Sequence, residues 1–101
     1  MLVDVIRHQH EKLGNALRAL MSLTTPAPQR VAHAMRELAL AFRDRPVPEW
    51  AAKHVGTIRS IVGNDGNVEA RAQALGELQL DEISAAFLDL YDVACREYWT
   101  A

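Results

Sequence analysis

The chain has 101 residues, of which half are hydrophobic and 24% are charged, and its formal net charge is −2. This composition is too apolar for a disordered chain, and the length suits one domain with one core over residues 1–101. No apolar run approaches the ~18 residues of a membrane span, and Asp4 and Arg7 stand where a signal peptide needs an apolar segment. We therefore expect a cytoplasmic protein with no membrane partner. Arginine outnumbers lysine nine to two, which indicates a bacterial source.

Charge is unevenly placed along the chain. Residues 1–59 hold nine Lys/Arg against five Asp/Glu, whereas residues 60–101 hold two against eight. Both halves carry apolar periodicity, so neither is a solvated tail. Either the two halves pack together and partly neutralise each other, or they present oppositely charged faces that favour association.

Apolar residues at helical spacing predict the first two elements. Leu13, Leu17 and Leu20 belong to an amphipathic helix over about 2–23, which the prolines of the TTPAPQ segment at 24–29 stop. A second helix is predicted over about 28–44, and its apolar face is made of Val31, Met35, Leu38 and Phe42.

Three further helices are predicted in the second half. The third runs over about 48–62, and Gly63 and Gly66 end it by adopting positive φ. The fourth, over about 67–77, is capped by Asn67, and Gly76 can end it. The fifth, over about 81–99, is capped by Asp81. No strand signal competes, so we predict an all-α, compact bundle of four to five helices. The break between the last two is the least defined.

The glycine-rich stretch IVGNDGNVEA at 61–70 invites comparison with ligand-binding loops. If Gly66 were the sixth residue of a calcium loop, Ile61 and Ala72 would stand where carboxylates are required. A phosphate loop would need a lysine and a hydroxyl after its last glycine, but Asn67 and Val68 follow. The stretch is therefore predicted to be a turn between helices.

The histidines do not form a convincing metal site. His8 and His10 point about 160° apart on a helix, so we expect both to be solvated. His10, His33 with Glu37, and His54 give an outline that resembles hemerythrin-like bundles, which implies further histidines toward the end of the chain. No histidine follows His54, and His33 lies opposite the apolar face of its helix. We predict no metal and no cofactor.

Two polar residues fall within apolar helix faces. Gln9 lies between Ile6 and Leu13 on the first helix, and His54 lies one turn from Trp50 and Ile58 on the third. A buried amide or imidazole needs hydrogen-bond partners. Either Gln9 and His54 are satisfied core groups, or they line a pocket with Trp50 at its rim, in a small-ligand-binding or orphan enzymatic bundle. The pocket residues of this alternative are Gln9, Trp50, His54 and Ile58.

Nucleic-acid binding and catalysis are not supported. The segment at 69–87 has the outline of a helix-turn-helix, but its second helix would present Asp81, Glu82 and Asp89 to phosphates. No nucleophile elbow, phosphate-binding glycine pattern or paired cysteines occur, so we expect no catalytic residues.

The fifth predicted helix has more apolar surface than one buried side needs. Leu88, Cys95 and Trp99 form a row beside its main stripe, which is either core or a homodimer interface. Trp and Tyr are common anchors of protein contacts. The sequence therefore favours a non-catalytic protein-interaction module, self-associating around Leu88, Cys95, Tyr98 and Trp99, in a small regulatory or accessory protein. Its partner is a protein, including a second copy of itself.

Overall fold

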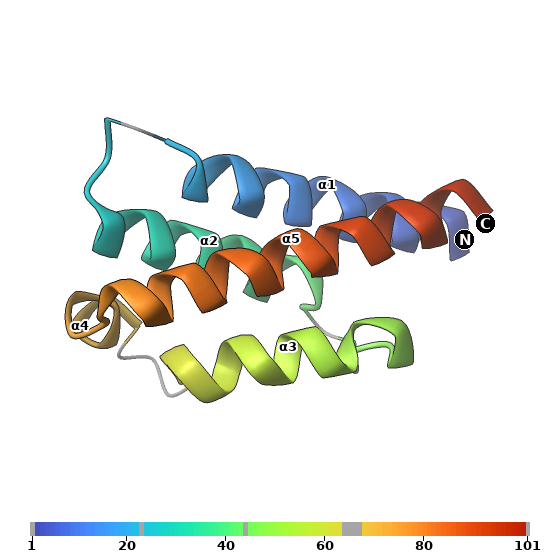
Figure 1. Ribbon diagram of the computed structural model, residues 1–101. Helices are drawn as coiled ribbons and strands as arrows, with labels where there is room; N and C mark the ends of the chain where they lie inside the picture. The colour runs from blue at the N-terminus through green and yellow to red at the C-terminus, as the bar shows by residue number, and fades with distance from the viewer. Residues whose placement is uncertain (1, 23, 44, 64–67, 101) are drawn as a thin grey trace.

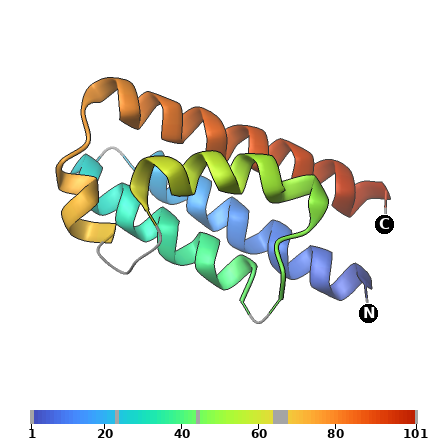
Figure 2. The ribbon, with the colours of Figure 1, turned by 90° about the horizontal axis from the view of Figure 1, so that it is seen from below.

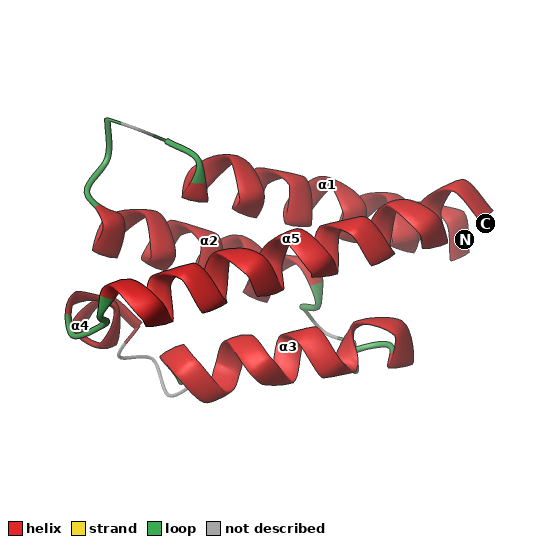
Figure 3. Ribbon diagram, viewed as in Figure 1, coloured by secondary structure: helices red, strands yellow, loops and turns green. Residues whose placement is uncertain are grey.

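The chain folds into five α-helices in the computed structural model, which describes residues 2–22, 24–43, 45–63 and 68–100. The helices are α1 (Leu2–Leu20), α2 (Ala27–Ala41), α3 (Glu49–Val62), α4 (Val68–Gln73) and α5 (Glu77–Thr100). Within these ranges there is no strand (Figure 3). The predicted all-α bundle is confirmed, and the last two helices are separate.

Four helices form the body of the bundle, and short α4 covers one end of it. α1 packs against α2 and α5, and α3 packs against α5. α1 and α3 lie diagonally opposite each other, with α2 and α5 between them (Figures 1 and 2). The start of α1 and the end of α5 lie at the same end of the bundle. None of the described helices combines the length and the apolar character that crossing a bilayer requires.

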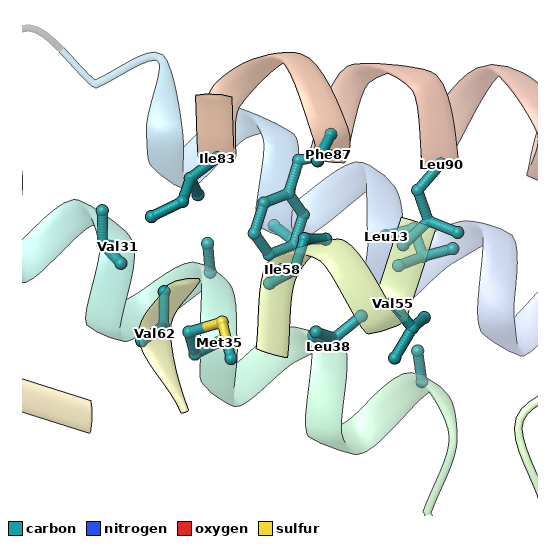
Figure 4. Packing of buried hydrophobic residues seen from close by; sticks show 14 of the residues in the cluster. Leu13, Val31, Met35, Leu38, Val55, Ile58, Val62, Ile83, Phe87 and Leu90 are labelled. Carbon is teal, nitrogen blue, oxygen red and sulfur yellow. The ribbon is translucent and has the colours of Figure 1, made fainter. Parts of the chain in front are cut away.

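The core consists of apolar side chains from all five helices. The α2 face predicted from sequence is buried throughout, because Val31, Met35, Leu38 and Phe42 all face inward. α5 contributes Phe87 between the aliphatic side chains of α2 and α3 (Figure 4). Burying each large aliphatic or aromatic side chain contributes about 1.5–3 kcal/mol to the hydrophobic stabilisation. The largest fully buried side chains are Leu13, Val31, Leu38, Val55, Ile58, Val62, Ile83, Phe87 and Leu90.

The first two helices end slightly earlier than predicted. α1 ends at Leu20, where the amides of Met21 and Ser22 bond to carbonyls three residues back and tighten the last turn. Ser22 and Thr25 then join their hydroxyls across the turn at 3.0 Å. α2 ends at Ala41. It begins at Ala27, with Pro28 in its first turn, where the missing amide hydrogen has no helical partner to lose.

Gly63 ends α3 as predicted. Its φ is 86°, and its amide donates to the Arg59 carbonyl at 2.7 Å. This left-handed conformation costs a residue with a Cβ about 1–2 kcal/mol, which explains a glycine here. The roles predicted for Gly66 and Asn67 lie outside the described residues.

α5 begins four residues before the predicted start, so the prediction that Asp81 caps it is wrong. The Gly76 amide donates to Oε1 of Gln79 at 3.1 Å, and the Leu80 amide donates to the Gly76 carbonyl at 3.0 Å. This is the reciprocal half of a capping box, in which a glutamine three residues into the helix bonds back to the cap amide. Gly76 therefore starts α5, rather than ending α4, which stops at Gln73.

Candidate functional site

The outward side of α5 carries three large apolar side chains that no other helix covers. Leu78 is 72% exposed, Leu88 is 55% exposed and Trp99 is 80% exposed. In Figures 1 and 2, α5 lies at the outside of the bundle along its whole length. We call these three residues the α5 outer strip. The alternative that the row containing Leu88 and Trp99 belongs to the core is excluded for those two residues.

Charged side chains of both signs accompany the α5 outer strip. Arg96 bonds to Asp92 one turn earlier, with Nη2 to Oδ2 at 2.9 Å, and both side chains are more than half exposed. Asp81 is exposed about one turn into the helix. An exposed ion pair of this kind contributes little to stability, so these charges are available for contacts with a partner.

Behind the α5 outer strip, the imidazole of His10 lies between two tyrosine rings of α5. Its ring centroid is 5.1 Å from that of Tyr91 and 4.9 Å from that of Tyr98, and both pairs are nearly parallel. Tyr91 and Tyr98 are seven residues apart, which corresponds to about 10 Å along a helix and leaves room for one ring between them. The stack fixes the C-terminal half of α5 against α1.

Cys95 joins the same cluster from between the two tyrosines. Its Sγ lies 3.3 Å from Nε2 of His10. Burial raises the pKa of the Tyr91 hydroxyl above its ordinary value, and a hydrogen bond to Cys95 raises it further, whereas the charge of Arg18 lowers it. Cys95 and Tyr98, predicted as interface residues, are half-buried and face α1. They therefore support the strip from behind.

Gly14 makes this close packing possible on the α1 side. A Cβ at this position would lie 3.3 Å from Cε1 of Tyr91, which is tighter than ordinary van der Waals contact. The glycine is buried, so the tyrosine ring rests directly on the helix backbone.

The prediction that His10 is solvated is wrong, because its ring is half-buried in the tyrosine stack. His8, in contrast, is exposed and donates to the Leu40 carbonyl at 3.1 Å. One signal in the sequence pointed to the stack: Tyr91, Cys95 and Tyr98 are spaced by four and three residues, which places them on one side of a helix.

The residues of the predicted small-ligand pocket lie on diagonally opposite helices. Gln9 is on α1 and only 4% exposed, so its predicted burial is confirmed. Ile58 is fully buried on α3, His54 is half-buried there, and Trp50 packs edge-on against Phe42 at 6.2 Å. In the described part of the chain, no hydrogen bond joins Gln9 to His54. The pocket remains a prediction.

His33 and Glu37 lie in a polar groove on the outer side of the seam between α1 and α2. Nε2 of His33 is 3.6 Å from Oε1 of Glu37, and the groove holds about 440 Å³. Arg18, Ser22 and Arg30 also line it. The described residues contain no group of three or more His, Cys, Asp or Glu side chains placed to hold a metal ion.

Similarity to other proteins adds nothing to this picture. No family model matches the chain, and neither the curated proteins nor the solved structures contain a significant match.

Proposed function

We propose that this chain is a non-catalytic helical protein-interaction module that binds a second copy of itself through the α5 outer strip. The observation that carries the proposal is the exposure of Trp99, at 80%, on the same helix as exposed Leu78 and Leu88. Scattered exposed apolar residues are normal, but a tryptophan aligned with two leucines on the uncovered side of one helix is typical of an interface. Tryptophan is also enriched among residues that dominate binding energy.

The support behind Trp99 favours binding over incidental exposure. Its ring lies 5.5 Å from that of Tyr98, which in turn stacks on His10. The backbone of α5 beneath Trp99 is thus held against α1 by contacts that no partner needs to supply. Pre-organisation of this kind lowers the entropy lost when an interface forms.

Composition suggests where this role takes place. The arginine-rich sequence and the single cysteine support a small accessory or regulatory protein of the bacterial cytoplasm.

Self-association is tested by sedimentation equilibrium of the purified chain from low micromolar to high micromolar concentration. We expect a concentration-dependent rise in mass from monomer to dimer. Trp99→Ala should weaken the dimer by about thirty-fold or more, as expected for an interface anchor that contributes at least 2 kcal/mol.

Met21→Ala is the matched control for this experiment. Met21 is a large apolar residue that is 67% exposed, but it follows the end of α1 and does not belong to the α5 outer strip. Its replacement should leave the dimer unchanged. A chain that stays monomeric at high micromolar concentration, or equal effects of the two substitutions, would overturn the proposal.

A further inference from the structure

The exposed apolar residues of α5 are arranged symmetrically about its middle. α5 runs from Glu77 to Thr100, so its midpoint falls between Leu88 and Asp89. Leu78 and Trp99 lie at equal distances from this midpoint, and Leu88 lies next to it. Leu78 and Trp99 are about 32 Å apart along the helix. Together with Leu88, they offer apolar contacts near both ends of the helix and at its centre.

These three residues also lie on one side of the helix. Successive residues turn by about 100°, so Leu78, Leu88 and Trp99 fall within an arc of about 80°. An arc of that width lies within the side that a helix can present to one packing partner. The strip can therefore contact one straight partner helix along its whole length.

One charged pair of the strip follows the same symmetry with opposite signs. Asp81 and Arg96 lie at equal distances on the two sides of the midpoint, and Asp92 lies at the same distance from it as the uncharged Ala85. All four residues are exposed, and all fall within the arc that contains the three apolar residues. The surface is therefore complementary to itself when it is reversed end to end.

We infer that the second copy binds with its α5 antiparallel to the first, about a two-fold axis that passes through the middle of both helices. In this arrangement Leu78 meets Trp99 of the second copy, Asp81 meets Arg96 of the second copy, and Leu88 packs beside the axis. A two-fold axis makes each contact occur twice. This inference rests on the proposed self-association and adds the direction and register of the two helices.

A parallel pairing in register fits the same surface poorly. It would place Asp81 against Asp81 of the second copy, and Asp92 against Asp92, so each acid would face a like charge. α5 carries six acidic residues and a single basic one, Arg96. A pairing that keeps Arg96 away from Asp81 of the second copy therefore leaves the repulsion between the acidic residues uncompensated. Opposite charges at matching positions fix register and direction in helix pairs.

Thiol crosslinking between two differently labelled chains tests the register. In a Cys95→Ser background, one chain carries Ala85→Cys and the other carries Asp92→Cys, and the two are mixed with a crosslinker that spans about 8–10 Å, the distance between packed helices. We expect mixed dimers to crosslink efficiently. Each chain alone should crosslink poorly, because like positions are then offset by about 10 Å along the helices.

The outcomes separate the inference from the proposed function. If sedimentation shows a dimer but each chain crosslinks to itself as well as to the other, the antiparallel register is wrong, whereas self-association stands. If neither the unmodified chain nor the Cys95→Ser chain forms a dimer, the inferred register and the proposed self-association both fail.

Charge reversal gives a second, independent test. Asp81→Arg alone and Arg96→Asp alone should each weaken the dimer by about ten-fold, because each creates two like-charge contacts across the axis. The double variant Asp81→Arg/Arg96→Asp restores both contacts and should recover most of the affinity. Failure of the double variant to recover affinity, with its helix content unchanged, would overturn the inferred pairing.

Discussion

Nε2 of His10 lies 3.3 Å from Sγ of Cys95, so a single contact joins two residues that are 85 positions apart in the sequence. This contact and the two tyrosine rings around it hold the last turns of α5 against α1. The C-terminal half of α5, which carries Trp99, is consequently a fixed part of the bundle.

Replacing the histidine should therefore destabilise the fold. We expect His10→Ala to lower the free energy of unfolding by about 1–3 kcal/mol, since it removes two aromatic contacts of about 0.5–1.5 kcal/mol each. Urea unfolding followed by circular dichroism measures this change. His8→Ala is the control, because His8 is exposed and loses only one hydrogen bond to the Leu40 carbonyl. An effect of His8→Ala as large as that of His10→Ala would contradict the role given to the stack.

The start of α5 can be tested with two substitutions. Gln79→Ala removes the side chain that accepts from the Gly76 amide and should lower the free energy of unfolding by about 0.5–1 kcal/mol. Asp81→Ala should have a smaller effect, since Asp81 lies inside the helix. Both are measured by urea unfolding at low micromolar concentration, where we expect the monomer. A larger loss for Asp81→Ala would support the start predicted from sequence.

Two helical glycines should respond differently to alanine. Gly56 is exposed within α3, and a Cβ there would meet nothing within 4 Å. Gly56→Ala should therefore raise the free energy of unfolding by about 0.5–1 kcal/mol. Gly14→Ala restricts the unfolded backbone in the same way, but it pushes a methyl group against Tyr91. The increase in the free energy of unfolding should therefore be smaller than for Gly56→Ala, or negative. Thermal or urea unfolding of the two variants gives the comparison, and equal gains would show that Tyr91 is loosely packed.

The raised pKa of Tyr91 predicts a loss of stability at alkaline pH. Because burial keeps the Tyr91 hydroxyl protonated in the folded chain, the unfolded chain loses this proton first as the pH rises past about 10. The contribution of the neutral hydroxyl is complete below that pH and is lost as the pH rises through the folded pKa. The free energy of unfolding should thus fall more steeply between pH 9 and 11 for the unmodified chain than for Tyr91→Phe. Parallel pH profiles for the two proteins would contradict this.

The sequence predicted those parts of the fold that depend on local periodicity. The α2 face from Val31 to Phe42 repeats at helical spacing, and hydrophobic burial alone then decides which side faces inward. Gly63 was also predictable, because a helix that ends in a left-handed residue favours glycine. The start of α5 was missed because Asp81 is a good cap in isolation, whereas the glutamine at 79 bonds back to Gly76.

Features that depend on tertiary contacts could not be found in the same way. His10 has charged and polar neighbours in sequence, and its burial comes from Tyr91 and Tyr98 on a helix at the other end of the chain. The row on α5 was recognised as apolar, but sequence could not decide whether it was core. The packing of α1 and α3 on the opposite side of α5 leaves Leu88 and Trp99 outside.

Burial of Trp99 by a second copy is the central claim, and acrylamide quenching of its fluorescence tests it most directly. In a Trp50→Phe variant, which keeps an aromatic ring against Phe42, Trp99 is the only tryptophan. Its quenching constant should fall several-fold as the protein concentration rises through the range in which the mass doubles. A quenching constant that stays high and unchanged across that range would contradict the claim, since Trp99 would then remain in water in every state of association.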